Sequence, residues 1–159
     1  MTDDERGAFH EGAHAALAIL LGQEVTRVEL PEGAAQGRCV FTHTGKLHPL
    51  DHAIIDFAGL EAEHQADPEH REPGEDEHPD ARFARTGDAR YHRRVTPDES
   101  HAESLFAGSA VKATMLRLAR SQARWRVREH QAAITRIAAA LLEKRSLPGH
   151  EVRRLMGFA

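Results

Sequence analysis

The motif HEGAH at His10–His14 places two histidines and a glutamate inside a strongly apolar segment, and this segment constrains the fold more than any other. Thr2 and Glu5 have the spacing of a capping box that opens a helix. Gly22 stands where the C-terminal cap of such a helix is expected. The residues between these caps are therefore predicted to form one helix. Since an α-helix turns once in about 3.6 residues, the two histidines lie on one face.

Two imidazoles on one helical face can bind a single metal ion. Leu17 and Leu21 continue the stripe of His10 and His14, so both rings are expected to face the protein interior. In the HExxH motif of zinc hydrolases the histidines hold the metal, and the glutamate takes a proton from the attacking water. The motif thus predicts a zinc cofactor, His10 and His14 as metal ligands, and Glu11 as the general base. The alternative is a pair of core histidines hydrogen-bonded to carboxylates.

The 159 residues fit one domain, predicted to cover residues 1–159. The single cysteine, Cys39, cannot form an internal disulfide, which favours a reducing cytoplasmic location. The sequence has no run of 18 apolar residues, and its N-terminus is acidic, unlike a signal or transit peptide. We therefore expect a soluble protein that has no membrane partner.

Charge is divided unevenly along the chain. Residues 1–80 hold 18 acids and 5 bases, whereas residues 81–159 hold 7 acids and 16 bases, giving net charges of −13 and +9. Such asymmetry can indicate nucleic-acid binding, or two halves that neutralise each other when they pack. The basic residues between Lys112 and Arg128 are spread around their predicted helix rather than along one face. The second interpretation is therefore favoured, and no nucleic-acid partner is expected.

The remaining pattern predicts a mainly α fold (α+β) with a small β-hairpin or sheet near the metal helix. Residues 25–30 and 38–42 are the β-prone runs of the hairpin. Proline at a first helical position and apolar residues at helical spacing predict the later helices. These are expected from Pro49 to the Asp67-Pro68 stop, over residues 89–94, from Thr96 through Leu116, from Gln122 to Lys144, and after Pro148.

Two groups of acidic and histidine side chains are of residue types that can bind a metal ion. Residues 67–85 form a predicted mobile acidic loop, because they are rich in proline and charge and lack periodicity. Glu61, Glu63 and His64 lie on the helix before this loop. They are most simply a solvated helix face, although they are also placed to approach the metal or one of its histidines.

With these residues in view, the chain resembles the zinc peptidase domain of the FtsH family, the membrane-anchored ATP-dependent proteases of bacteria and organelles. Four segments carry the resemblance, and together they span nearly the whole chain. They are HEGAHAALAILLG, FAGLEAEH, RTGDARYH and ALLEKRSLPGHEVRRLM.

The resemblance implies a mainly helical peptidase domain in which His10, His14 and Asp88 bind zinc and Glu11 activates water. In the family several residues separate the glycine from the aspartate, whereas Gly87 and Asp88 adjoin here. No GxxxxGK[ST] motif occurs, so the ATP-driven unfolding motor of the family is not expected. The expected substrates are therefore peptides or unstructured protein segments, supplied where needed by a separate partner or activator. An oligomer is compatible with the sequence.

A non-catalytic interaction module of the same fold, with a structural zinc, is the competing hypothesis. Such a zinc has four protein ligands, whereas a catalytic zinc leaves one position to water. Glu61, His64 or the acidic loop would supply the fourth ligand. In the catalytic case a second donor besides zinc is expected for the tetrahedral oxyanion, and the candidates are Tyr91, His92 and His101.

Overall fold

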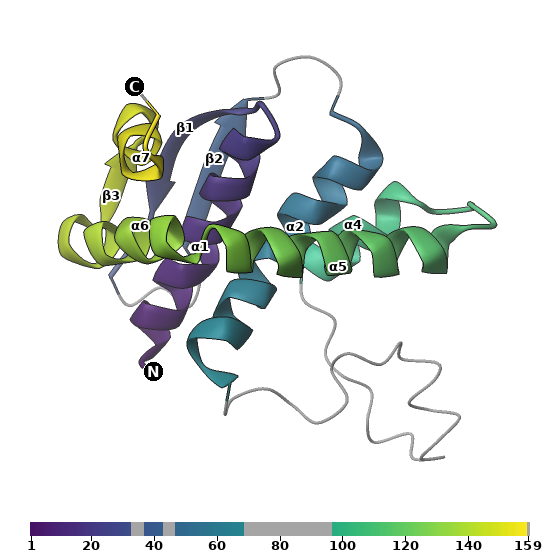
Figure 1. Cartoon of the computed structure of the whole chain (residues 1–159), viewed down its shortest axis with the longest axis horizontal. Coiled ribbons are helices and arrows are strands. Elements are labelled where there is room, and N and C mark those ends of the chain that lie inside the picture. The colour runs from purple at the N-terminus through teal and green to yellow at the C-terminus, as the bar shows by residue number, and fades with distance from the viewer. Residues whose placement is uncertain (33–36, 43–46, 69–96, 159) are drawn as a thin grey trace.

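The computed structural model describes residues 1–32, 37–42, 47–68 and 97–158. Helices predominate and a small sheet lies beside them, which confirms the predicted mainly α class (Figure 1). The helices are α1 (Asp3–Leu20), α2 (Pro49–Ala66), α4 (Pro97–Leu105), α5 (Lys112–Glu129), α6 (Gln131–Lys144) and α7 (Gly149–Met156); the strands are β1 (Glu24–Glu29), β2 (Arg38–Thr42) and β3 (Ser146–Pro148). Within the described ranges, no helix has the length and apolar character needed to cross a bilayer.

Helix α1 is the centre of the fold and contacts α2, α6, β1 and β2. It begins as predicted, because the Thr2 hydroxyl accepts from the backbone N–H of Glu5 and the Glu5 carboxylate accepts from the backbone N–H of Thr2. The helix ends just before Gly22, also as predicted. Its residues from Ala13 to Ala18 are all buried, so most of the circumference of α1 is covered by other elements.

The sheet has the strand order β2-β1-β3, and both pairs are antiparallel. The predicted hairpin is confirmed as the β1–β2 pair, whose register slips between Val25 and Arg27. Strand β3 was not predicted, since its three residues are too few to show any periodicity. Leu147 of β3 pairs with Val28 of β1, and both side chains are fully buried beside α7 and α1.

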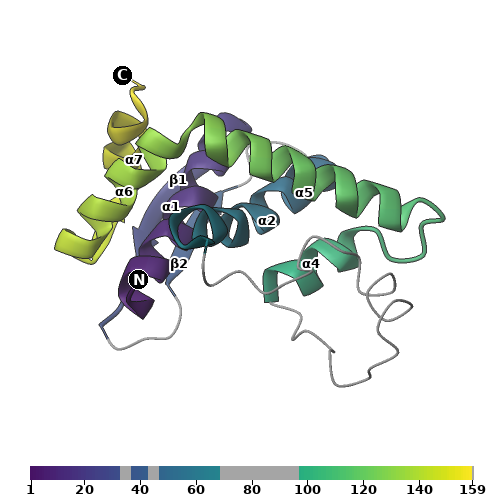
Figure 2. The ribbon, with the colours of Figure 1, turned by 60° about the horizontal axis from the view of Figure 1, so that its bottom comes forward.

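The C-terminal helices differ from the two long helices that the sequence predicted. The helix expected from Thr96 through Leu116 is divided into α4 and α5 by a turn that contains Gly108 at φ +77°. The pattern from Gln122 to Lys144 is also divided, because α5 ends at Glu129 and α6 begins at Gln131. The two breaks let α4 and α5 both pack on α2 while α6 packs on α1, as Figure 2 shows.

Part of the sequence prediction falls on residues that the structure does not describe. The acidic loop predicted at 67–85 lies almost wholly there, and so does the short helix predicted at 89–94. These two predictions therefore stay predictions.

A buried ion cluster joins α2 to α5. The Glu61 side chain is 2% exposed and accepts from Arg120 Nε and Arg124 Nε, each at 2.8 Å. The prediction that Glu61 lies on a solvated helix face is therefore wrong. Helical periodicity does not show whether a charged side chain faces water or a partner on another helix. The cluster pairs an acid of the N-terminal half with two bases of the C-terminal half, and the half-buried Asp4–Arg145 pair likewise joins the two halves.

Substituting Glu61 by Gln should lower the free energy of unfolding by about 3 kcal/mol, because removing one partner of a buried ion pair leaves the others uncompensated. The matched control is Glu103→Gln, which removes an exposed Lys112 partner and should cost less than about 1 kcal/mol. Urea unfolding at pH 7 measures both variants. Equal effects of the two substitutions would contradict a structural role for the buried cluster.

The same cluster predicts a dependence of stability on pH. Burial raises the pKa of Glu61, but hydrogen bonds from Arg124 and Arg120 outweigh it, so the pKa in the folded protein is below the ordinary value. A lowered pKa contributes stability above the unfolded-state pKa, and this stability is lost as the pH falls through the folded-state pKa. The stability difference between wild type and Glu61→Gln should therefore shrink below about pH 4. Urea midpoints of both proteins between pH 7 and pH 3 test this; a constant difference would contradict it.

Candidate metal centre and catalytic glutamate

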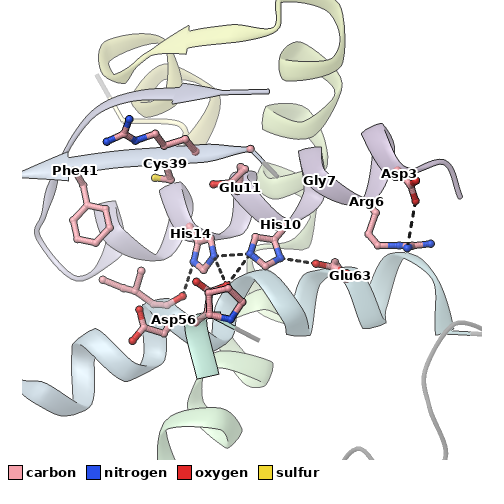
Figure 3. Close-up of a pocket in the computed structure, with 15 residues that line it drawn as sticks. Asp3, Arg6, Gly7, His10, Glu11, His14, Cys39, Phe41, Asp56 and Glu63 are labelled. Carbon is pink, nitrogen blue, oxygen red and sulfur yellow. Dashed lines mark hydrogen bonds and ion pairs between the residues drawn. The ribbon is translucent and has the colours of Figure 1, made fainter. Parts of the chain in front are cut away.

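Three ligand atoms from two helices converge beside α2. His10 and His14 project from α1 (Figure 3). Asp98 stands in the first turn of α4. His10 Nε2 lies 2.9 Å from His14 Nε2 and 3.0 Å from Asp98 Oδ2. His14 Nε2 lies 3.6 Å from the same carboxylate oxygen. The two histidines of the motif thus meet one carboxylate that is 84 residues or more away in the chain.

The outer nitrogens of both imidazoles are held by α2. His14 Nδ1 donates to the backbone carbonyl of Ile55 at 2.7 Å, and His10 Nδ1 donates to Glu63 Oε1 at 2.5 Å. A carbonyl and a carboxylate can only accept, so each neutral ring carries its proton on Nδ1. Each Nε2 then presents a lone pair to the same point as the Asp98 carboxylate. Fixing the tautomer from outside in this way is typical of histidines that bind a metal.

The size and chemistry of this group fit zinc. Zinc bonds nitrogen and oxygen at about 2.0–2.1 Å, so neighbouring ligand atoms of a tetrahedral site lie roughly 3.3 Å apart. The three separations of 2.9, 3.0 and 3.6 Å bracket that value. Three acceptor atoms repel one another unless a cation or a proton lies between them. His10, His14 and Asp98 would therefore be able to supply three ligands to a zinc ion, and all three line one cavity.

Without a metal, a proton takes the place of the cation. Burial lowers the pKa of His10, but hydrogen bonds to Asp98 and Glu63 outweigh this and raise it to about 10. Burial raises the pKa of Asp98, yet its hydrogen bonds to His10 and His14 hold the value well below the ordinary range. The site thus requires one positive charge among its acids, which either a proton or a metal ion supplies.

Glu11 lies between the ligand group formed by His10, His14 and Asp98 and the start of strand β2. Its side chain is buried, and the backbone N–H of Cys39 donates to its carboxylate. Burial raises the pKa of Glu11, against the opposing fields of His14 and His10. A raised pKa makes a carboxylate a better proton acceptor near neutral pH. Gly37, just before β2, leaves the space for this side chain, because a Cβ there would lie 2.4 Å from Glu11 Cγ.

A cavity of about 590 Å³ opens beside these residues, within the range of small-ligand sites. Its wall is formed by α1, the start of β2, α2 and the start of α4. Five of its lining side chains are acidic and two are arginines, so the cavity has an excess of negative charge that favours a cation. The acidic lining residues are Asp3, Glu11, Asp56, Glu63 and Asp98.

The structure brings together some of the predicted site residues. His10, Glu11 and His14 lie together as the motif predicts, whereas Asp88 lies outside the described residues. The carboxylate that meets the histidines is Asp98, near the start of the helix that the sequence predicts from Thr96. A helix N-terminus that presents an acidic side chain was the only signal for it, and most such residues are simply favoured by the helix dipole.

The structure places the other residues that were predicted near the metal in different surroundings. For Glu63 the preferred solvated-face interpretation is wrong and the alternative, an approach to one of the histidines, is confirmed, because Glu63 accepts from His10 Nδ1. His101 pairs with Asp56 at 2.9 Å. Tyr91 and His92 lie outside the described residues. Within the described ranges, the group at the motif histidines has three ligands and does not include Glu61 or His64.

Comparisons with known proteins found no matching family model and no matching curated protein.

Gly59 of α2 is a sensitive position for the site. A Cβ there would lie 2.5 Å from His10 Nε2, so Gly59→Ala should push the imidazole away from Asp98 and weaken zinc binding at least tenfold. The control is Gly12→Ala inside the motif, whose added Cβ would meet Ile137 at an ordinary 3.4 Å. Calorimetric titration with ZnCl₂ measures both variants. Unchanged zinc affinity in Gly59→Ala would show that His10 does not hold the metal in this position.

Proposed function

We propose that the protein is a zinc-dependent endopeptidase that needs no ATP for hydrolysis. The observation that carries the proposal is the convergence of His10 Nε2, His14 Nε2 and Asp98 Oδ2 on one point, with the Glu11 carboxylate beside them. The resemblance of the motif helix and the C-terminal helices to the FtsH peptidase domain supports the same activity. A cytoplasmic location agrees with a single cysteine that has no partner for an internal disulfide.

In this proposal Asp98 takes the place of the third zinc ligand that the resemblance had assigned to Asp88. With Asp98 as the ligand, the short spacing of the RTGD segment no longer matters. Gly87 and Asp88 adjoin in this chain, whereas several residues separate the glycine and the aspartate in the FtsH family. Asp98 stands in the first turn of α4, which begins at Pro97, and its Oδ2 lies 3.0 Å from His10 Nε2. Asp98→Ala should therefore lose most zinc binding.

Glu11 performs the proton transfers. When bound, zinc lowers the pKa of a coordinated water to about 7 and polarises the scissile carbonyl. The Glu11 carboxylate accepts the proton of the attacking water and then donates it to the amide nitrogen that leaves. Its burial keeps bulk water from competing for that proton, and the Cys39 N–H holds one side of the carboxylate in place. Glu63 and the Ile55 carbonyl keep the two imidazoles oriented throughout.

Strand β2 is suited to hold the substrate. It pairs with β1 on one side and stands at the edge of the described sheet, and its residues Arg38, Cys39 and Phe41 line the cavity. An extended peptide can add to such an edge through main-chain hydrogen bonds, which bind many sequences without requiring particular side chains. This mode of binding fits an enzyme that acts on unstructured segments.

The non-catalytic hypothesis requires a fourth protein ligand. Glu61, one of its candidates, is bound to Arg120 and Arg124 on the α5 side of α2. This contact supports an open fourth position and hence the catalytic interpretation. X-ray absorption of the zinc-loaded protein separates the two, because a catalytic site shows three protein ligands and one water.

Substituting Glu11 by Gln should preserve zinc binding and lower turnover at least 100-fold, since only the proton acceptor is lost. Cleavage of fluorescently labelled unfolded casein and of a mixed peptide library measures turnover. Zinc per chain is measured on the same samples. Glu103→Gln, remote from the cavity, is the control and should match wild type. Full turnover in Glu11→Gln would refute Glu11 as base, and four protein ligands on zinc without any cleavage would establish the non-catalytic module.

A further inference from the structure

A second group of side chains of metal-ligand type lies near His10, His14 and Asp98, and it consists of His52, Asp56 and His101. His52 and Asp56 stand one turn apart on α2, the same spacing as His10 and His14 on α1. His101 reaches them from α4. One ligand atom from each of these three residues lies within 4.8 Å of the others.

The contacts within this group are specific. His101 Nδ1 lies 2.9 Å from Asp56 Oδ2, which is within the separation of two ligands on one zinc. The His52 and His101 rings meet edge to face, with their centroids 4.8 Å apart. A hydrogen-bonded pair of Asp56 and His101 alone does not require a third ligand atom at this distance. The position of His52 therefore favours a site for a shared ion.

The charge and burial of Asp56 also favour a bound cation. Its carboxylate is only 12% exposed, and it lines the cavity that also holds the carboxylates of Glu11, Glu63 and Asp98. Several buried negative charges around one cavity repel one another unless cations lie among them. His101 is 48% exposed, so an ion can enter from solvent and its remaining coordination positions stay open to water.

We propose that His52, Asp56 and His101 form a second site for a divalent cation, adjacent to the centre at His10 and His14. Two imidazole nitrogens and one carboxylate oxygen suit zinc or another transition metal of similar softness, rather than magnesium or calcium. The ion would bridge α2 and α4. It would also place a positive charge at the acidic cavity without taking a ligand from the first centre. The proposal does not require that the protein be a peptidase.

Zinc stoichiometry tests the proposal. The full chain is stripped of metal with a chelator, and zinc uptake from ZnCl₂ is measured by equilibrium dialysis and calorimetry. His101→Ala and His52→Ala should each bind one equivalent fewer than wild type. His150→Ala, which removes an exposed histidine of α7, is the control and should bind as much as wild type. Circular dichroism checks that each variant folds, and the exposure of His101 makes its substitution the safer one.

His14→Ala tests the centre at His10 and His14 separately. This variant should lose the zinc equivalent of that centre and keep the equivalent that His101→Ala loses. The double variant should lose both. If His101→Ala and His52→Ala both bind as much zinc as wild type, the second site does not exist and Asp56–His101 is only an ion pair. If His14→Ala instead retains full stoichiometry while His101→Ala does not, the centre of the proposed function fails and the second site stands.

Discussion

Helices α1 and α2 pack closely against each other, and this contact orients both histidines of the motif. Along this contact the backbone carbonyl of Ile55 and the carboxylate of Glu63 accept the Nδ1 protons of His14 and His10. The same contact buries the apolar faces of both helices, and Gly59 lets the His10 ring approach α2 closely. Packing and tautomer selection are therefore a single event: when the helices dock, both Nε2 lone pairs are directed to one point.

Helix α4 completes the site because α2 and α5 hold it in place. Asp98 in its first turn meets the histidine pair, and His101 one turn later meets Asp56 of α2. The buried Glu61 joins α2 to α5 through Arg120 and Arg124. Acids from three helices thus surround one cavity, an arrangement that is unfavourable without compensating cations. The zinc proposal and the second-site proposal are two consequences of this one electrostatic condition.

The predictions that the structure confirms rest on residues that are close together in the chain. The capping box at Thr2, the motif histidines one turn apart and the proline that opens α2 each depend on local spacing, and local spacing survives in the folded helix. The predictions about Glu61 and Glu63 failed for the opposite reason. Periodicity shows which residues share a face of a helix, but it does not show whether another helix covers that face.

Periodicity and capping over a few residues are enough to predict the helix with His10, Glu11 and His14, the hairpin beside it and the mainly α class. They are not enough to predict that Asp98 is the carboxylate facing the histidines or that Glu63 holds one of them. These contacts join α1 to α2 and α4 across 53 and 88 positions of the chain. Their geometry is set by helix packing, which no short stretch of sequence contains.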